Sequence, residues 1–487
     1  MFYNNLTLLT DLYQLTMMQG YFNTSLSEKE VVFDLFYRNN PSGNGYAITA
    51  GLEQAVGYIK ELKFSAEDIV YLRGLKLFTD PFLDTLTRFK FTGDIHAIPE
   101  GTPVFPHEPL VRVRARLFEA QFIETAILNI INHQSLIATK AARVVAAAGG
   151  DGVLEFGLRR AQGPDAGIYG ARAAMIGGCS ATSDVLAGRM FGVPVRGTHA
   201  HSWVMSMDDE YTALKTYAEC FPEVCTLLVD TYDTLKSGVP NAIRVFTEMR
   251  EKGVTFKSYG IRLDSGDLAY LSKRARAMLD EAGFTDAVIS ASGDLDEYLI
   301  TSLKLQGAKI GVWGVGTNLV TSQDHPAFGG VYKMSAEIGE NGAVIPKLKL
   351  SESADKITNP GIKKVARLYD KKTQKVKADL IMLDHETINI EEDLTIFDPL
   401  ATWKRMTLPA GGYCARELLK PVFVKGELVY TSPPVMEIRD YCKNELDSLW
   451  DEHKRLVNPH PLPVDLSREL YDLKQDMIVK IKAGAYR

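Results

Sequence analysis

The stretch YGIRLDSGDLAYLSKRARAMLDEAGFTDAVISASGD, residues 259–294, decides the fold class. It opens with a short apolar strand, YGIRLD, and continues in DLAYLSKRARAMLDEAG, whose apolar residues have helical spacing. It then returns to a second strand, AVISASG. A strand, a helix and another strand in this order predict two parallel strands joined by a crossover helix.

The same alternation continues on both sides of this stretch. Further strands are predicted at VLEFG (153–157), VPVRGTH (193–199), CTLLVD (225–230) and IGVWGVG (310–316), and further helices at NAIRVFTEMREKG (241–253) and DEYLITSLKLQG (296–307). So many strand–helix units in succession predict an α/β fold with an irregular β/α barrel. A doubly wound open sheet is the structural alternative.

The parts of the chain before and after this alternation have a mixed pattern. VVFDLFYR (31–38) is typical of a strand, residues 114–148 have helical spacing throughout, and SRELYDLKQDMIVKIKAG (467–484) predicts a terminal helix. We therefore expect residues 136–350 to form the barrel domain. Residues 1–135 and 351–487 are expected to form one flanking α+β domain, and residues 370–487 contain no recognisable chemistry.

Composition limits the function. The 487 residues carry a net charge of −6 without a basic cluster, which argues against a nucleic-acid partner. No apolar run approaches the ~18 residues of a membrane span, and the N-terminus lacks the pattern of a signal peptide. The five cysteines form no C-x-x-C pair, which favours a reducing compartment. We expect a soluble cytoplasmic protein without a membrane partner.

Polar residues gather where the predicted strands end. They include Asp230, Arg262, Asp264 and Gly293, and in a β/α barrel such strand ends share the rim that holds the active site. A single cluster has a simpler explanation, because Asp264 or Ser265 could cap the helix that follows. Six clusters on one rim favour an active site.

The chemistry of these clusters favours phosphate. SASGDLDEY and WGVGTNLV place glycine and small polar residues between a strand and a helix, where backbone N–H groups and the helix dipole attract anions. Arg159, Arg160 and Arg262 supply positive charge, although salt bridges to nearby aspartates would also explain them. Asp230 and Asp264 suit Mg²⁺ shared with substrate oxygens. A dinucleotide-binding glycine loop at GVWGVG is a weaker alternative.

GTHAHSW, residues 197–203, raises the possibility of a His-x-His metal-dependent hydrolase. Such a site needs histidine ligands after later strands, and there is no histidine between residues 202 and 324. Ser202 does not lie in a nucleophile elbow, so a Ser–His–Asp triad is also weak. On a rim that binds phosphate, a neutral imidazole could itself attack a phosphoryl group.

These motifs resemble the nicotinate phosphoribosyltransferases, a branch of the type II phosphoribosyltransferases. The matching stretches, in family order, are TDLYQLTM (10–17), FDLFYRNNP (33–41), EFGLRRAQGPDAG (155–167), GTHAHSWV (197–204), GIRLDSGDLAYLS (260–272), SGDLDEY (292–298), WGVGTNLVTS (313–322) and KITNPGIKKV (356–365). The resemblance implies that nicotinate and 5-phosphoribosyl 1-diphosphate become nicotinate mononucleotide and diphosphate, a step of NAD salvage. It also implies coupling to ATP hydrolysis through a phosphohistidine, with Mg²⁺.

The resemblance implies a role for each matching residue. His201 would be phosphorylated, and His199 would be only its neighbour. Tyr13, from the second subunit of a homodimer, and Phe156 would hold the pyridine ring. The remaining assignments are Arg159 and Arg262 for substrate anions, Arg38 (again from the second subunit) and Lys333 for diphosphate, Gly293, Asp294, Gly316 and Thr317 for the 5-phosphate, Asp264 for the ribose hydroxyls or Mg²⁺, and Asp230 for the metal.

One residue departs from the family pattern. Asp184, in ATSDVLAG, stands where enzymes that use the acid usually have Asn and relatives that use nicotinamide have Asp. A carboxylate there would repel nicotinate and accept from an amide, or it could simply cap the next helix. Nicotinamide phosphoribosyl transfer therefore stays open as an alternative, together with the metal-dependent hydrolase and a non-catalytic nucleotide sensor.

Overall fold

The computed structural model describes residues 5–24, 26–353 and 356–484. The chain divides into two compact units, and each is described by itself. The first consists of residues 1–136, 327–433 and 440–487, and the second of residues 137–326 and 434–439. Among the described residues, no helix is both long and apolar enough to cross a lipid bilayer.

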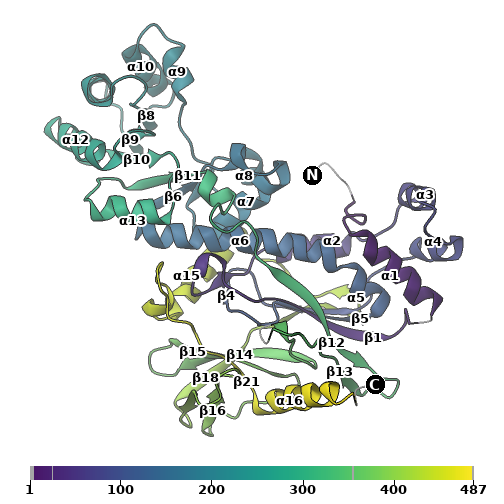
Figure 1. Cartoon of the computed structure of the whole chain (residues 1–487). Helices are drawn as coiled ribbons and strands as arrows, with labels where there is room; N and C mark the ends of the chain where they lie inside the picture. The colour runs from purple at the N-terminus through teal and green to yellow at the C-terminus, as the bar shows by residue number, and fades with distance from the viewer. Residues whose placement is uncertain (1–4, 25, 354–355, 485–487) are drawn as a thin grey trace. The chain divides into compact units, whose positions relative to one another are not determined.

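The second unit is built on a parallel six-stranded sheet in the order β7-β6-β11-β10-β9-β8 (Figure 1). Its strands are β6 (Gly152–Glu155), β7 (Ala181–Thr182), β8 (Val224–Leu228), β9 (Ser258–Leu263), β10 (Val288–Ser292) and β11 (Val312–Val315). Its helices are α7 (Pro164–Ile176), α8 (Val185–Phe191), α9 (His201–Met205), α10 (Glu210–Cys220), α11 (Val239–Glu251), α12 (Leu268–Glu281), α13 (Glu297–Leu305) and α14 (Thr317–Val320).

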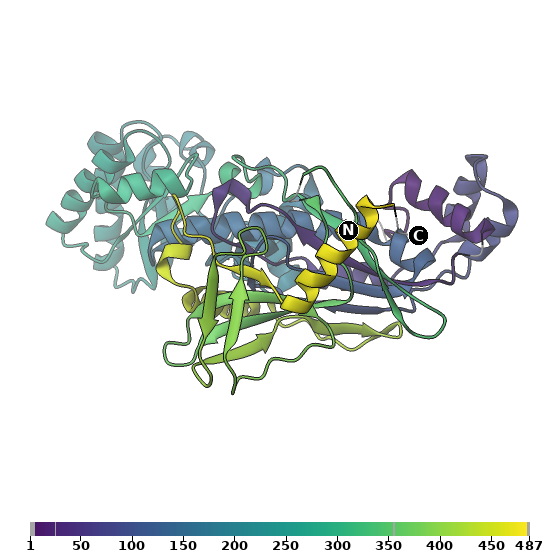
Figure 2. The ribbon, with the colours of Figure 1, turned by 60° about the horizontal axis from the view of Figure 1, so that its bottom comes forward.

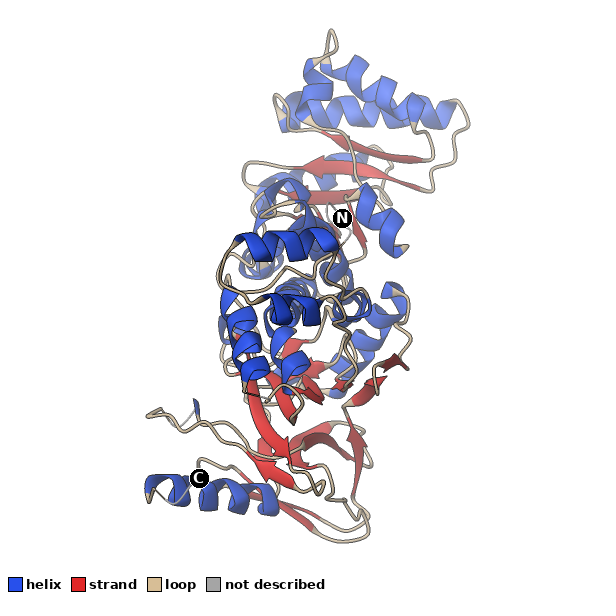
Figure 3. Cartoon of the chain, turned by 90° about the vertical axis from the view of Figure 1, so that its right-hand side faces the viewer, coloured by secondary structure: helices blue, strands red, loops and turns tan. Residues whose placement is uncertain are grey.

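The predicted alternation forms because the strands are buried and the helices are amphipathic. Residues 259–261 and Leu263 of β9 are buried, as expected for a parallel strand covered on both faces. In α12, Leu268, Ser272, Ala275 and Leu279 are buried at helical spacing. The helices lie against the strands, as Figure 3 shows.

The barrel is closed by an extended segment rather than by a regular strand. Residues 193–199, predicted as a strand, form a single parallel bridge, between Thr182 of β7 and Val195. On the other side, the Thr198 hydroxyl donates to the carbonyl of Thr226, 2.5 Å away, and the backbone N–H of Leu228 donates to Nε2 of His199 at 3.1 Å. The irregular β/α barrel expected from the sequence is confirmed, and side chains complete its closure next to β8.

The first unit is dominated by an antiparallel seven-stranded sheet in the order β13-β12-β1-β5-β3-β19-β20, and a four-stranded sheet has the order β18-β14-β15-β21. Its strands are β1 (Glu30–Tyr37), β2 (Ala47–Ile48), β3 (Asp94–Ala97), β4 (Pro103–Val104), β5 (Val111–Arg116), β12 (Gly330–Ile338), β13 (Val344–Pro346), β14 (Lys363–Asp370), β15 (Val376–Leu383), β16 (Leu394–Phe397), β17 (Arg405–Leu408), β18 (Tyr413–Glu417), β19 (Lys420–Val424), β20 (Glu427–Leu428) and β21 (Val464–Leu466).

Helices cover these sheets. They are α1 (Leu12–Asn23), α2 (Leu52–Lys60), α3 (Ala66–Gly74), α4 (Asp80–Leu86), α5 (Leu117–Phe122) and α16 (Arg468–Lys482), while α6 (Glu124–Ala148) and α15 (Val435–Ser448) run through the boundary between the two units. The C-terminal helix α16, yellow in Figure 2, contributes Leu470 to the core of the first unit. That core combines residues from both ends of the chain.

Two boundaries differ from those predicted. The barrel unit ends at Pro326 instead of residue 350, because β12 pairs antiparallel with β1 and so belongs to the flanking unit. The single helix predicted over 114–148 is wrong at its start, since residues 111–116 form β5, and α5 and α6 follow. The pairing of β1 with β5 and β12 is long-range, so local periodicity does not reveal it.

Candidate active site

The carboxyl edge of the barrel brings most of the predicted site residues together. Phe156 and Arg159 follow β6, Asp184 follows β7, Asp230 follows β8, Arg262 and Asp264 lie at the end of β9, Gly293 and Asp294 follow β10, and Gly316 and Thr317 follow β11. His201 is the first residue of α9. Arg159 is exposed, and the other residues lie on or beside the ends of the strands.

A hydrogen-bonded cluster of Arg262, Ser292 and Asp264 lies at the centre of this edge. The Arg262 Nε donates to the Ser292 hydroxyl at 2.9 Å, and its Nη2 lies 3.0 Å from Asp264 Oδ1. Ser292 also donates to Asp264 Oδ1. Burial raises the pKa of Asp264, but the hydrogen bond from Ser292 and the charge of Arg262 outweigh burial, so this pKa lies below its usual value. Asp264 is therefore held as a carboxylate.

The sequence left a helix-capping role open for Asp264, and this alternative is wrong. Asp267 is the N-cap of α12, because its side chain accepts the backbone N–H of Tyr270 at 2.9 Å. The Asp264 side chain instead bonds to Arg262 and Ser292. The Asp264 carboxylate therefore belongs to the Arg262 cluster of the site and not to the cap of α12.

Asp230 and Asp264 present carboxylate oxygens that fit a hard divalent cation. Asp230 Oδ2 accepts from the Asp264 backbone N–H at 2.7 Å and from the Ser265 hydroxyl at 2.8 Å. Asp230 Oδ1 is buried without a hydrogen-bond partner. Within the described ranges, no three His, Cys, Asp or Glu side chains form a metal cluster. This donor set suits a cation such as Mg²⁺, which keeps waters and substrate oxygens among its ligands.

The two histidines of GTHAHSW have different surroundings. His199 is buried, and its Nε2 accepts the Leu228 N–H; burial lowers the pKa of His199 to about 4, so it is a neutral acceptor. The ring of His201 faces the site, with Nδ1 3.1 Å from the Thr231 hydroxyl and Nε2 3.6 Å from Asp264 Oδ2. The His199 backbone carbonyl accepts from Arg262 Nη1 at 3.4 Å, but of the two rings it is that of His201 that lies beside Asp264 of the Arg262 cluster.

Thr231 was not selected by sequence reasoning. It follows Asp230 directly at the end of β8, so its position in the chain was the available signal. Its hydroxyl fixes the orientation of the His201 ring through Nδ1. It therefore belongs with the site residues.

A cavity of about 420 Å³ lies inside the barrel and reaches the carboxyl edge at Phe156 and Arg262. Gly314 lines it, and a Cβ at Gly314 would lie 2.6 Å from two ring atoms of Phe156. The ring of Phe156 therefore packs directly on the backbone of Gly314. Glu155, buried at the end of β6, accepts from the Thr182 hydroxyl at 2.6 Å and from the Gly157 N–H, which fixes the backbone on both sides of Phe156.

Asp184 caps α8. Its Oδ1 accepts the backbone N–H groups of Leu186 at 2.9 Å and Ala187 at 3.0 Å. Its Oδ2 is buried and has no hydrogen-bond partner. The residue is only 2% exposed. The capping role allowed by the sequence is confirmed, and it occupies one of the two carboxylate oxygens.

Two turns carry the glycines expected to bind phosphate. We call residues 293–296 the first loop and residues 316–318 the second loop. Gly293 has a φ of +96° and Asp294 a φ of +44°. A Cβ at Gly293 would lie 2.4 Å from the carbonyl of Asp264, so the turn requires glycine. Gly316 precedes α14, and Thr317 is the first residue of this helix.

The remaining predicted residues, Tyr13, Arg38 and Lys333, belong to the first unit. Tyr13 lies on α1 and is 46% exposed; burial and then the charge of Glu124 raise its pKa. Lys333 Nζ lies 3.9 Å from Glu124 Oε1, and burial lowers its pKa with smaller effects from Lys349 and Arg38. Glu124, which was not predicted, is thus a shared neighbour of Tyr13 and Lys333.

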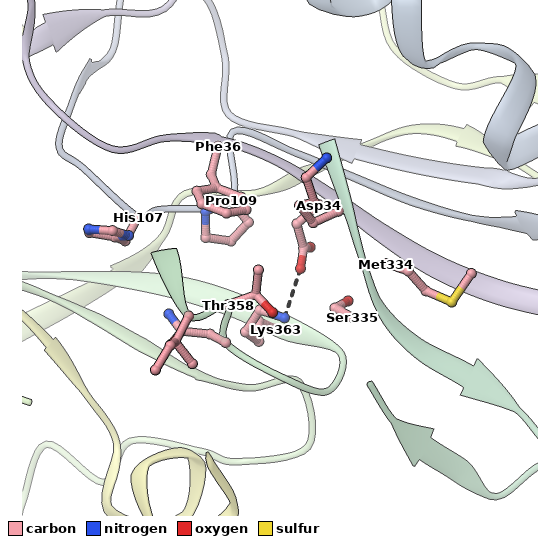
Figure 4. Close-up of a pocket in the computed structure, with 11 residues that line it drawn as sticks. Asp34, Phe36, His107, Pro109, Met334, Ser335, Thr358 and Lys363 are labelled. Carbon is pink, nitrogen blue, oxygen red and sulfur yellow. Dashed lines mark ion pairs between the residues drawn. The ribbon is translucent and has the colours of Figure 1, made fainter. Parts of the chain in front are cut away.

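Lys333 is among the residues that line a small pocket in the same unit. The pocket also contains a buried ion pair, the dashed line between Asp34 and Lys363 in Figure 4. Asp34 of β1 and Lys363 of β14 lie 2.7 Å apart, and both side chains are almost completely buried. Since Asp34 is the direct partner of Lys333 between β1 and β12, the pair anchors the strand that carries Lys333. Arg38 follows β1, and its Nε is buried without a hydrogen-bond partner.

An irregular β/α barrel with an antiparallel flanking unit is the architecture of a type II phosphoribosyltransferase. In the solved structures, the chain matches human nicotinic acid phosphoribosyltransferase with a TM-score of 0.83 and 30% identity, covering 96% of this chain and 99% of that one. Nicotinate-nucleotide pyrophosphorylase from Pyrococcus furiosus shares the fold, with a TM-score of 0.69 and 23% identity over 91% of this chain and 95% of that one.

The chain belongs to the nicotinate phosphoribosyltransferase family. Residues 8–132 match the N-terminal domain model of this family, and residues 362–474 match its C-terminal domain model. Nicotinate phosphoribosyltransferase of Bacillus subtilis is 48% identical, over 99% of this chain and 96% of that protein. The Dictyostelium discoideum nicotinate phosphoribosyltransferase is 36% identical, over 96% and 87%. The resemblance found in the sequence motifs is confirmed.

Proposed function

We propose that this protein transfers the phosphoribosyl group of 5-phosphoribosyl 1-diphosphate to nicotinate, giving nicotinate mononucleotide and diphosphate. The observation that carries the proposal is the cluster of Arg262, Ser292, Asp264 and His201, whose Arg262 lines the barrel cavity. It combines a cation, a fixed carboxylate and an imidazole next to a space for an aromatic ring. Membership of the family supports the same reaction.

The reaction needs positioning more than proton transfer. The pyridine nitrogen is already a nucleophile; it forms the bond to C1 of the ribose while the bond from C1 to the diphosphate oxygen breaks. Positive charge develops at C1 and negative charge on the leaving group. Phe156 and Arg159 hold nicotinate, Arg262 holds a substrate anion, and the Asp264 carboxylate lies where it can bind the ribose hydroxyls. Electrostatic stabilisation and orientation supply most of the acceleration.

Mg²⁺ is the cation expected at Asp230 and Asp264. Bound there, it would neutralise charge on the diphosphate oxygens. Asp230 Oδ1 has no hydrogen-bond partner, so it is the oxygen that could bind the cation. Asp230 Oδ2 holds the Asp264 backbone, so one residue supports the position of the other.

ATP coupling through His201 belongs to the same proposal. With a proton on Nδ1 donated to Thr231, the Nε2 lone pair is free to attack the γ-phosphorus of ATP. The bond from Nε2 to phosphorus forms as the bond to the oxygen of ADP breaks, and water later hydrolyses the phosphohistidine. His199 cannot take this role while its Nε2 accepts the Leu228 N–H.

Tyr13 and Arg38, as contributions from a second subunit, and Lys333 complete the proposal. In this arrangement Tyr13 covers the pyridine ring opposite Phe156, and Arg38 and Lys333 bind diphosphate. Tyr13 and Lys333 share Glu124 as a neighbour on the first unit, and the charge of Arg38 acts on Lys333, which supports a joint role. A homodimer with shared active sites follows from it.

Nicotinamide is the second candidate base. It is favoured by one observation, the buried Asp184 Oδ2, which could accept from an amide and would repel a carboxylate. The motifs around Asp184 and the named relatives favour nicotinate.

A pyridine-base assay tests the function. Purified protein is incubated with 5-phosphoribosyl 1-diphosphate and Mg²⁺ and with nicotinate, nicotinamide or quinolinate, each with and without ATP, and diphosphate release is measured. We expect turnover with nicotinate and stimulation by ATP. Turnover with nicotinamide but not with nicotinate would show that nicotinamide is the substrate. A rate with nicotinate that is the same with and without ATP would contradict the coupling.

A further inference from the structure

Two buried cations on α6 contact residues just beyond both loops. Lys140 Nζ lies 2.8 Å from Glu297 Oε2 and 2.7 Å from Asp324 Oδ1. Glu297 is the first residue of α13 and directly follows the first loop. Asp324 lies four residues after α14, the helix that the second loop begins. One ammonium group therefore joins the segments that leave the two loops.

Arg143, one turn further along α6, strengthens this connection. Its Nε lies 2.7 Å from Glu297 Oε1, and its Nη2 donates to the Tyr298 hydroxyl at 2.9 Å. The side chains of Lys140, Arg143 and Glu297 are 4%, 1% and 0% exposed. Two cations face two carboxylates, so the group is electrically balanced.

Asn318 joins the two loops directly. Its side-chain amide donates to the carbonyl of Asp294 at 2.9 Å and to the carbonyl of Leu295 at 3.1 Å. Asn318 follows Thr317 at the start of α14, and Asp294 and Leu295 lie in the first loop. The neighbouring strands fix the bases of the loops, because Ser292 of β10 pairs with Gly314 of β11.

Stability alone does not account for these buried ions. A buried ion pair gains little over apolar side chains of the same volume, because desolvation offsets the attraction. What the pairs do fix is geometry, since each charge must keep its partner. Asp294 has a positive φ, a conformation that costs free energy and persists only where neighbouring contacts hold it.

We propose that Lys140 and Asn318 are positioning residues that hold the two loops at a fixed separation and thereby set the affinity for the 5-phosphate of the phosphoribosyl substrate. The inference rests on the proposed function, in which both loops bind one phosphate group. Lys140 acts through Glu297 and Asp324, and Asn318 acts through the backbone of the first loop. Neither residue is assigned a contact with the substrate.

Lys304 offers a matched control on the same helix as Glu297. It lies near the C-terminal end of α13 and pairs with Asp151 at 2.7 Å, beside the start of β6 and away from both loops. Lys304→Met therefore breaks an ion pair of α13 without releasing either loop. Lys140→Arg is the conservative variant that keeps the charge.

The test compares the KM for 5-phosphoribosyl 1-diphosphate, the KM for nicotinate, and inhibition by ribose 5-phosphate. Lys140→Met and Asn318→Ala are expected to raise the phosphoribosyl KM and the ribose 5-phosphate inhibition constant about ten-fold, because small misplacements of binding groups are costly. The nicotinate KM should change less than two-fold. Lys140→Arg should recover most of the loss, and Lys304→Met should leave all three constants near those of the wild type.

Equal effects of Lys140→Met and Lys304→Met on the phosphoribosyl KM would overturn the proposal, as would unchanged constants in Asn318→Ala. Asn318 is only partly buried, so its variant supplies a result even where Lys140→Met does not fold. Wild-type turnover is measured in parallel and tests the proposed function separately. If the wild-type protein does not turn over 5-phosphoribosyl 1-diphosphate, the proposed function is wrong. If the wild type turns over normally and the variants have unchanged constants, only the positioning role is wrong.

Discussion

The imidazole of His199 accepts the backbone N–H of Leu228, with 3.1 Å between Nε2 and the backbone nitrogen. This side chain supplies at the end of β8 an acceptor that a paired strand would otherwise provide. The same geometry commits the ring to its neutral form, because a protonated Nε2 has no lone pair to offer. The barrel is thus closed in part by a group that titrates.

His199 should make stability depend on pH. The pKa of His199 is lowered from 6.5 to about 4 in the folded protein, so the unfolded state binds the proton more tightly. The stabilisation is complete above pH 6.5 and is lost as the pH falls from 6.5 to 4, by up to about 3 kcal/mol. In His199→Gln the amide oxygen still accepts the N–H but does not titrate. In urea unfolding between pH 4 and 7.5, the free energy of unfolding should fall more steeply with decreasing pH for the wild type than for His199→Gln. An equal pH dependence in the two proteins would contradict this role.

His201→Ala should uncouple the reaction from ATP. Loss of the nucleophilic nitrogen removes acid-labile phosphate incorporation from ATP and ATP-stimulated turnover, while a basal phosphoribosyl transfer persists. His199→Gln is the control, since His199 serves the backbone of Leu228. Labelling with radioactive ATP followed by acid and base treatment measures the phosphohistidine. Wild-type labelling of the His201→Ala protein would show that another residue is phosphorylated.

Gly314→Ala should weaken nicotinate binding. The new methyl group would lie 2.6 Å from two ring atoms of Phe156, so the ring must leave its place. We expect the KM for nicotinate to rise roughly ten-fold, with a smaller change in the KM for the phosphoribosyl substrate. Gly311→Ala, just before the same strand, is the control, because its methyl group would meet only Val288 at 4.0 Å. Similar kinetics for both variants would mean that Phe156 does not hold the base.

Asp184→Asn should increase selectivity for nicotinate. Asparagine caps helices about as well as aspartate, so α8 keeps its cap while the negative charge disappears. If the buried Oδ2 faces the base, the nicotinate KM should fall by about three- to ten-fold and nicotinamide should become a poorer substrate. Asp184→Ala removes both the charge and the cap, so it measures the contribution of the cap, and it should lower the free energy of unfolding by about 1 kcal/mol. An unchanged ratio for the two bases would place Oδ2 away from the base.

The parts predictable from sequence were those that local patterns encode. Buried strands such as β9 and amphipathic helices such as α12 are evident in the spacing of apolar residues. The site residues of the barrel follow from their positions at strand ends. The closure next to β8 was not predictable, because it depends on side chains of Thr198 and His199 bonding to a distant strand.

Other features depend on contacts that periodicity does not encode. Lys140 and Arg143 lie in an unremarkable helical stretch, and their importance appears only when Glu297 folds against them. The sequence left a cap of α12 at Asp264 or Ser265 open as an alternative, and the cap is formed by Asp267, since each of these residues is a good cap in isolation. The subunit contributions of Tyr13 and Arg38, and the Mg²⁺ site, stay predictions.

The pairing of β1 with β12 has a consequence for how the protein is made. Strand β5 follows β1 closely, but β12 leaves the ribosome only after about 300 further residues. At a translation rate of about 5–20 residues per second, this delay lasts roughly 15–60 s. Throughout that time one edge of a strand that is almost wholly buried in the folded protein lacks its native partner, while residues 137–326 of the barrel unit emerge. The nascent chain therefore passes through a stage in which chaperones have an exposed strand edge to protect.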